Sequence, residues 1–100
     1  MIITLAVSPH GVKPNSFFLL RVSIADKQYI PRQLKFLLTG SNNEPIAVNL
    51  GGAFDNMGGI SDPAINEWVM KNNYHVYPHG NPTKLKFKLL HSWLVFIEKD

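Results

Sequence analysis

Alternation of apolar and polar residues at every second position is the sequence feature that most constrains the fold of this chain. It is clearest over residues 83–90, where three lysines alternate with Leu85, Phe87 and Leu89. A period of two places successive side chains on opposite faces of a β-strand. We therefore expect a strand here, with one face in the core and the other in solvent.

Five more short segments are rich in β-branched or alternating apolar residues, and we expect strands at 2–7, 17–25, 33–38, 45–50 and 93–97, with a further short extended strand at 74–77. The turn-like residues 26–28 predict that the second and third of these segments pair as a hairpin. A tight turn at residues 91–92 predicts a hairpin between the last two strands. One long bent strand over 83–97 is the alternative.

One stretch, residues 61–72, has the periodicity of an amphipathic helix. Its apolar stripe begins at Ile65 and continues at positions i+3 and i+4. Ser61 or Asp62 can cap the start, and if Asp62 is the cap, Pro63 takes the first helical position, where its missing N–H does no harm. A helix of about three turns follows from this pattern.

These elements predict an α+β fold, with an antiparallel sheet of five to seven strands and the helix 61–72 covering one face or closing one end. A sheet curled toward a barrel also fits. The chain has 100 residues, of which 45% are hydrophobic and 17% charged. That length suits one domain over 1–100, and the apolar content is sufficient for a core.

The sequence contains no cysteine, which excludes disulfides, thiolate metal sites and cysteine nucleophiles. No apolar run approaches the roughly 20 residues of a membrane span. The apolar start of the chain has no preceding basic region and no small-residue cleavage site, unlike a signal peptide. We therefore expect a cytoplasmic protein that makes no membrane contact and holds no cofactor or metal.

The alternating lysines are the clearest candidate for a binding surface. Lys84, Lys86 and Lys88 should project from one strand face at intervals of about 6 to 7 Å, close to the spacing of phosphates along a nucleic-acid strand. Lys71 and Tyr77 are near in sequence, and cations beside aromatic rings suit a single-strand groove. The net charge of +3 favours acidic partners only mildly. A simple solvated strand face is the other explanation, and the more ordinary one.

Residues 51–59 contain four glycines and predict a loop before the helix. Their spacing matches no phosphate-binding motif, and an aspartate in the next turn would repel a phosphate. Phe54 and Met57 should either pack onto the core or be exposed to a partner. Trp68 and Trp93 are expected in the core, with an exposed interface position as the alternative.

The histidines and carboxylates show no catalytic spacing, and no serine lies in a nucleophile elbow. A site would require at least two of four histidines to meet a carboxylate: His10, His75, His79 and His91. We therefore predict no catalytic residues and no metal ligands, and we expect exposed or turn histidines instead.

Taken alone, the sequence favours a small non-enzymatic binding module. Its most ordinary partner is another protein or a second copy of the chain, bound through an exposed sheet edge or the 51–59 loop. A nucleic-acid-binding domain using the lysine face is the first alternative. A small enzyme with a histidine–carboxylate site is the second.

Overall fold

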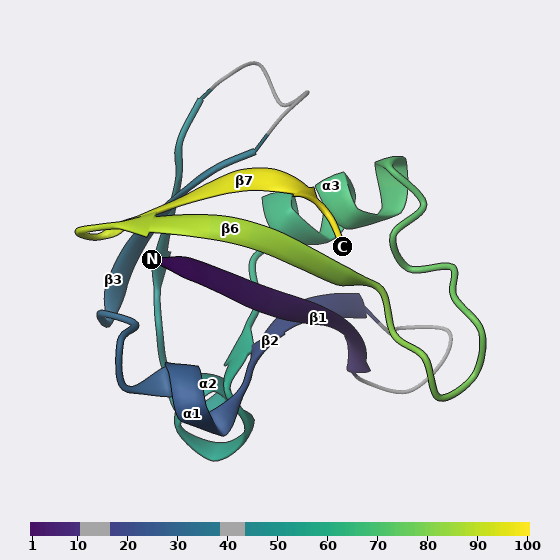
Figure 1. Ribbon diagram of the computed structural model, residues 1–100, viewed down its shortest axis with the longest axis horizontal. Helices are drawn as coiled ribbons and strands as arrows, with labels where there is room; N and C mark the ends of the chain where they lie inside the picture. Colours follow the sequence, from purple (N-terminus) through teal and green to yellow (C-terminus); the bar gives the residue numbers. More distant parts are fainter. Residues whose placement is uncertain (11–16, 39–43) are drawn as a thin grey trace.

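The computed structural model describes residues 1–10, 17–38 and 44–100, and its main element is a mixed, seven-stranded sheet curled into a half-barrel (Figure 1). The strands are β1 (Ile2–His10), β2 (Phe17–Val22), β3 (Gln33–Leu37), β4 (Ile46–Asn49), β5 (Gly59–Ile60), β6 (Lys84–Leu90) and β7 (Trp93–Lys99). Their order across the sheet is β4-β3-β7-β6-β1-β2-β5. Neighbouring strands are antiparallel, except that β3 and β7 are parallel.

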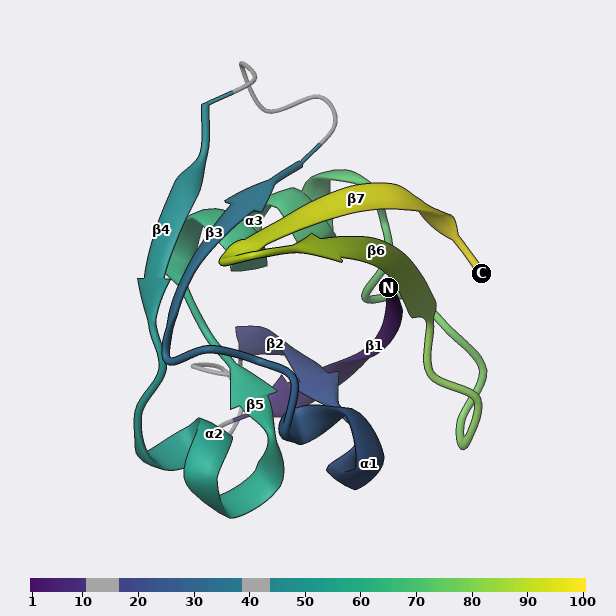
Figure 2. The same cartoon turned by 60° about the vertical axis from the view of Figure 1, so that its left-hand side comes forward.

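The hydrophobic core fills the concave, inner face of the sheet. Figure 2 shows the curl, with β7 and β6 above, β1 and β2 below, and β3 and β4 at the left. Alternate residues of each strand face inward: Ile3, Leu5 and Val7 of β1 are buried. Phe87 packs edge-on against both Phe36 and Phe96, with centroids 5.6 and 5.5 Å away, so rings from β3, β6 and β7 meet.

Within the described ranges, three short helices accompany the sheet: α1 (Ile24–Lys27), α2 (Gly52–Met57) and α3 (Pro63–Lys71). The helix expected at 61–72 is α3, and of the two caps considered, Asp62 is the N-cap, because its carboxylate accepts from the Ala64 N–H at 2.8 Å. The buried stripe packs into the same core as the strands. Asn66 also accepts a hydrogen bond from the Phe18 N–H at 2.8 Å, which ties α3 to β2.

The hairpin expected between 17–25 and 33–38 is wrong. β2 pairs with β1 and β5, while β3 pairs with β4 and β7. Ser23 ends β2 by capping α1, since its hydroxyl accepts from the Asp26 N–H at 3.3 Å. The chain then crosses to the other side of the half-barrel, which places β3 parallel to β7 and makes the sheet mixed rather than purely antiparallel.

The loop expected at 51–59 is also wrong, because this segment forms α2 and β5. Phe54 lies on the inward side of α2 and is buried in the core. Gly58 ends the helix in the left-handed region, at φ 72°, where glycine is favoured. A buried aromatic residue and a terminating glycine are enough for a short helix in glycine-rich sequence.

The hairpin expected at the end of the chain is confirmed. β6 and β7 pair antiparallel, and His91 occupies the turn with φ 54°. Leu85 and Phe87 are buried, while Lys84 and Lys88 are exposed on the opposite face. This confirms the alternation on which the strand was predicted. The short strand expected at 74–77 is wrong, because these residues form turn and irregular structure between α3 and β6.

Candidate functional site

The lysines of β6 project from the convex, outer face of the sheet. The register places Lys84 beside Ala6, Lys86 beside Thr4 and Lys88 beside Ile2. The row that contains Lys84 continues across Ala6 to Arg21 of β2. Three adjacent strands therefore carry a row with a cation at each end and a small residue between them.

The middle lysine differs from its neighbours in its ion pairs. The Lys86 Nζ lies 3.4 Å from the Asp100 carboxylate and 3.9 Å from that of Glu98, and its side chain is 36% exposed. Among the residues that the structure describes, Lys84 and Lys88 have no ion pair. The outer face thus offers two unpaired ammonium groups, separated by one that is neutralised.

The hairpin end of the same face carries an aromatic residue beside another cation. Trp93 of β7 lies between Lys35 of β3 and Leu90 of β6 in a cross-strand row. The Lys35 Nζ lies 5.4 Å from the centroid of the Trp93 ring, a cation–π contact. The parallel pairing of β3 and β7 creates this contact. We call the outer-face residues Arg21, Lys35, Lys84, Lys86, Lys88 and Trp93 the basic face.

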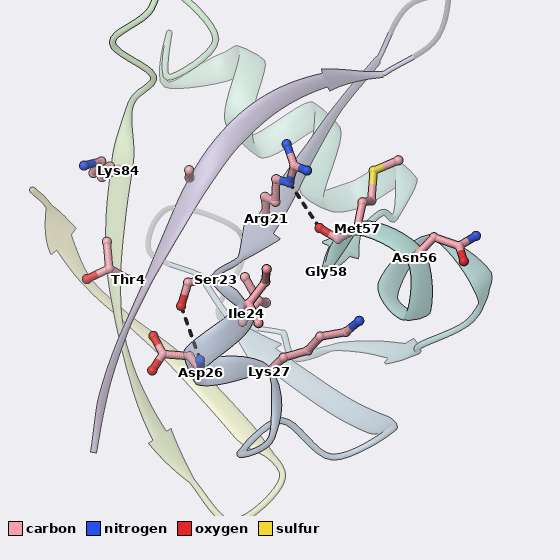
Figure 3. A pocket seen from close by; sticks show the side chains of 12 residues that line it. Thr4, Arg21, Ser23, Ile24, Asp26, Lys27, Asn56, Met57, Gly58 and Lys84 are labelled. Atoms are coloured by element: carbon pink, nitrogen blue, oxygen red, sulfur yellow. Dashed lines mark hydrogen bonds between the residues drawn. The ribbon is translucent and has the colours of Figure 1, made fainter.

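At its other end, the basic face runs into a groove of about 460 Å³ (Figure 3). Thr4 and Ala6 contribute to its lining from β1, and α1 and the end of α2 form part of its wall. The Arg21 Nε donates to the Met57 carbonyl at 3.1 Å. In Figure 3, Lys84 lies on the opposite side of the groove from Arg21. The cations surround the groove and do not converge on one point.

Helix α1 supplies the remaining polar groups of the groove. The Lys27 Nζ donates to the Asp55 carbonyl at 2.6 Å and lies 5.4 Å from the centroid of the Phe54 ring. Asp26 also lines the groove, and Ile24 beside it is 93% exposed. The groove is therefore mixed in character, with basic groups, one carboxylate and one aliphatic side chain in solvent.

Positive charge is concentrated on this side of the described structure. Six basic side chains belong to the basic face or the groove: Arg21, Lys27, Lys35, Lys84, Lys86 and Lys88. Three acidic side chains accompany them: Asp26, Glu98 and Asp100. This excess of three equals the net charge of the whole chain. A modest total charge is therefore distributed unevenly, which raises the local potential.

The other residues expected at a nucleic-acid surface lie elsewhere. Lys71 is in the last turn of α3, the helix that packs into the core. Tyr77 packs partly against the core and lines a second cavity of about 210 Å³, which it shares with Lys84. The structure thus brings Tyr77 near one of the three lysines and leaves Lys71 on a different element, away from the basic face.

The two residues expected in an interaction loop also separate. Phe54 is buried, which is the first of the two placements considered for it. Met57 is partly buried and lines the groove. Arg21 and Lys35 were not predicted as site residues, although alternation marks both as outward-facing. The core position expected for Trp93 is wrong: its side chain is partly exposed on the outer face, which is the alternative considered for it. Its contact with Lys35 depends on which strands pair.

The histidines do not form a site in the described part of the chain. His79 and His91 are exposed in turns, and His75 packs against Phe18 with ring centroids 5.2 Å apart. None of these three histidines forms an ion pair with a carboxylate of the described residues, which also include no cluster of three that could hold a metal ion. The side chain of His10 lies outside the described residues.

Comparison with known proteins found no matching family model, no matching curated protein and no matching solved structure. Within the described residues, no helix has both the length and the apolar character that a membrane span requires.

Proposed function

We propose that this chain is a non-enzymatic binding domain whose ligand is a nucleic acid held on the basic face. The observation that carries the proposal is that Lys35, Lys84 and Lys88, which form no ion pair within the described residues, share one sheet face with the partly exposed Trp93. Lys84 and Lys88 are about 14 Å apart along β6, a distance that spans two phosphate intervals of an extended strand. Nucleic-acid affinity comes largely from such phosphate contacts.

The test is a fluorescence-anisotropy titration of single-stranded and duplex oligonucleotides at two salt concentrations. We expect binding that weakens as salt rises, and a double variant, Lys84→Glu with Lys88→Glu, that loses most of this binding. The slope of log K against log salt is negative, and each lost phosphate contact should make it less steep by about 0.7 for single strands. Lys71→Glu is the matched control for each single variant, Lys84→Glu or Lys88→Glu, because it makes the same change of two charges on α3. Losses in the single β6 variants that are no larger than the loss in Lys71→Glu, or no binding at low salt, would contradict the proposal.

Protein binding at the groove is a second candidate, supported by Ile24. This residue is 93% exposed and is flanked by Arg21 and Lys27 at the groove. An acidic partner with a small apolar pocket would complement these features. If this candidate holds, Ile24→Ser should abolish co-purification of a partner that the Lys88→Glu variant retains. Partner recovery that is unaffected by Ile24→Ser would exclude the groove as its binding site.

A further inference from the structure

The two tryptophans of this chain have very different surroundings. Trp68 is 4% exposed and packs edge-on against Tyr74 and Phe96, at centroid distances of 5.2 and 5.0 Å. Trp93 is partly exposed on the outer face, and within the described residues no aromatic ring stacks on it. The Trp93 ring contacts the Lys35 ammonium, which ends a flexible and exposed side chain. Trp93 is therefore available for stacking in a way that Trp68 is not.

We infer that the nucleic acid bound on the basic face is single-stranded and stacks an unpaired base on Trp93. The inference rests on the proposed function and deepens it by naming the class of ligand. An exposed cation–π contact is weaker than stacking between a base and an aromatic ring. An incoming base can therefore displace the Lys35 ammonium from the indole ring, and Lys35 then meets the phosphate next to that base.

The register of the sheet sets the path of the strand beyond that base. Val95 of β7 is two residues past Trp93 and pairs with Lys88 of β6, so Lys88 is one row, about 7 Å, away along the sheet. Lys84 and Arg21 follow two rows further on, at the groove. The sugar–phosphate backbone of the ligand thus runs along β6 from the hairpin toward the groove. Lys86 lies on this path and is ion-paired with Glu98 and Asp100.

A duplex fits this surface less well, because its bases are already stacked on one another and cannot cover Trp93 without being unpaired. Leu90, which is 46% exposed, lies on the other side of Trp93 in the same row. It extends the apolar platform beneath a flat base. Discrimination between a single strand and a duplex therefore depends on Trp93 and Leu90, at the hairpin end of the basic face. Charge attraction to phosphates depends on all the cations of the basic face.

The experiment compares four probes with the full chain: oligothymidine, oligouridine, an abasic oligomer of the same length, and a duplex. The abasic oligomer keeps the phosphates and lacks the bases, so it separates stacking from charge. We expect oligothymidine or oligouridine to bind about 5- to 100-fold more tightly than the abasic oligomer. Whichever of the two binds more tightly distinguishes a DNA ligand from an RNA ligand. Trp93→Ala should abolish the advantage over the abasic oligomer and leave the salt dependence unchanged.

Tryptophan fluorescence gives a second readout. Base stacking should quench the emission of Trp93, and the emission that remains in Trp93→Phe should come from buried Trp68 and resist quenching. The wild-type comparison of base-containing and abasic oligomers requires no substitution, so a poorly folded variant does not remove the test. Equal binding of all four probes would overturn the inference and leave the proposed function intact. Failure of every probe to bind would overturn both.

Discussion

Gly58 is a residue at which the backbone admits no side chain. Its φ is 72°, and a Cβ added there would lie 2.5 Å from the Val22 carbonyl oxygen. We predict that Gly58→Ala lowers the free energy of unfolding by more than about 2 kcal/mol, through both the left-handed conformation and the clash. Urea denaturation measures the loss. Gly80 is the matched control, because its φ is 80° and an added Cβ meets nothing within 4 Å. Equal losses at both positions would show that the close approach to Val22 contributes nothing.

His75 carries a buried polar atom that finds no partner in the described part of the chain. Its Nδ1 makes no hydrogen bond to residues 1–10, 17–38 or 44–100, while its ring packs beside Phe18. We predict that His75→Phe raises the free energy of unfolding by about 1 kcal/mol, because it removes this buried ring nitrogen and keeps a flat ring. Thermal and urea denaturation would measure the gain. His79→Phe, in an exposed turn, should change little, and a clear loss of stability in His75→Phe would contradict the argument.

At the scale of elements, an ion pair links α2 to the segment that leads into β3. Arg32 donates to the Asp55 carboxylate, and this hydrogen bond, together with the charge of Arg32, lowers the pKa of Asp55. A lowered pKa stabilises the fold above the ordinary pKa of aspartate, and this contribution is lost as pH falls through the lowered value. Both side chains are about half exposed or more, so the effect on global stability is small.

We predict that Arg32→Gln raises the pKa of Asp55 toward its ordinary value. NMR titration of the side-chain carboxyl measures this directly. Lys71→Gln removes a charge on α3 and serves as the control, with no change expected at Asp55. A titration of Asp55 that is the same in both variants and in the wild type would show that Arg32 does not hold the carboxylate in solution.

The elements also show what the sequence could and could not predict. The β6–β7 hairpin and α3 were predicted because their signals are local: alternation at Lys84 to Leu90, a tight turn, and a capped apolar stripe. The pairing of β3 with β7 could not be predicted, because it depends on how the chain crosses the half-barrel. The Lys35–Trp93 contact depends on that pairing, so this end of the basic face could not be predicted from the sequence.

The prediction of a loop at residues 51–59 was wrong for a different reason. Glycine content predicts a loop when only local flexibility is considered, but burial of Phe54 stabilises α2 through tertiary packing. The lysine row was predictable as an outward-facing set. The difference between Lys86 and its two neighbours was not predictable. The acids that neutralise Lys86 come from the far end of β7 and meet it only after the hairpin has formed.

For the whole molecule, the relevant quantity is how charge is divided between faces. A net charge of +3 is small for a nucleic-acid-binding protein, but the basic face and groove carry an excess of that same size. Glu98 and Asp100 reduce the local charge at the centre of this surface. Under the proposed function, they limit the number of phosphates that this surface neutralises along β6.

We predict that the double variant Glu98→Gln with Asp100→Asn binds single-stranded oligonucleotides more tightly and with a steeper salt dependence. Release of Lys86 supplies one more phosphate contact, which should make the negative slope of log K against log salt steeper by about 0.7. Anisotropy titrations over a range of salt concentrations measure it. Glu67→Gln, on the exposed side of α3, removes a carboxylate away from the basic face and should leave the slope unchanged. If the double variant binds more tightly but with an unchanged slope, Lys86 makes no phosphate contact, and the gain reflects only a weaker overall repulsion.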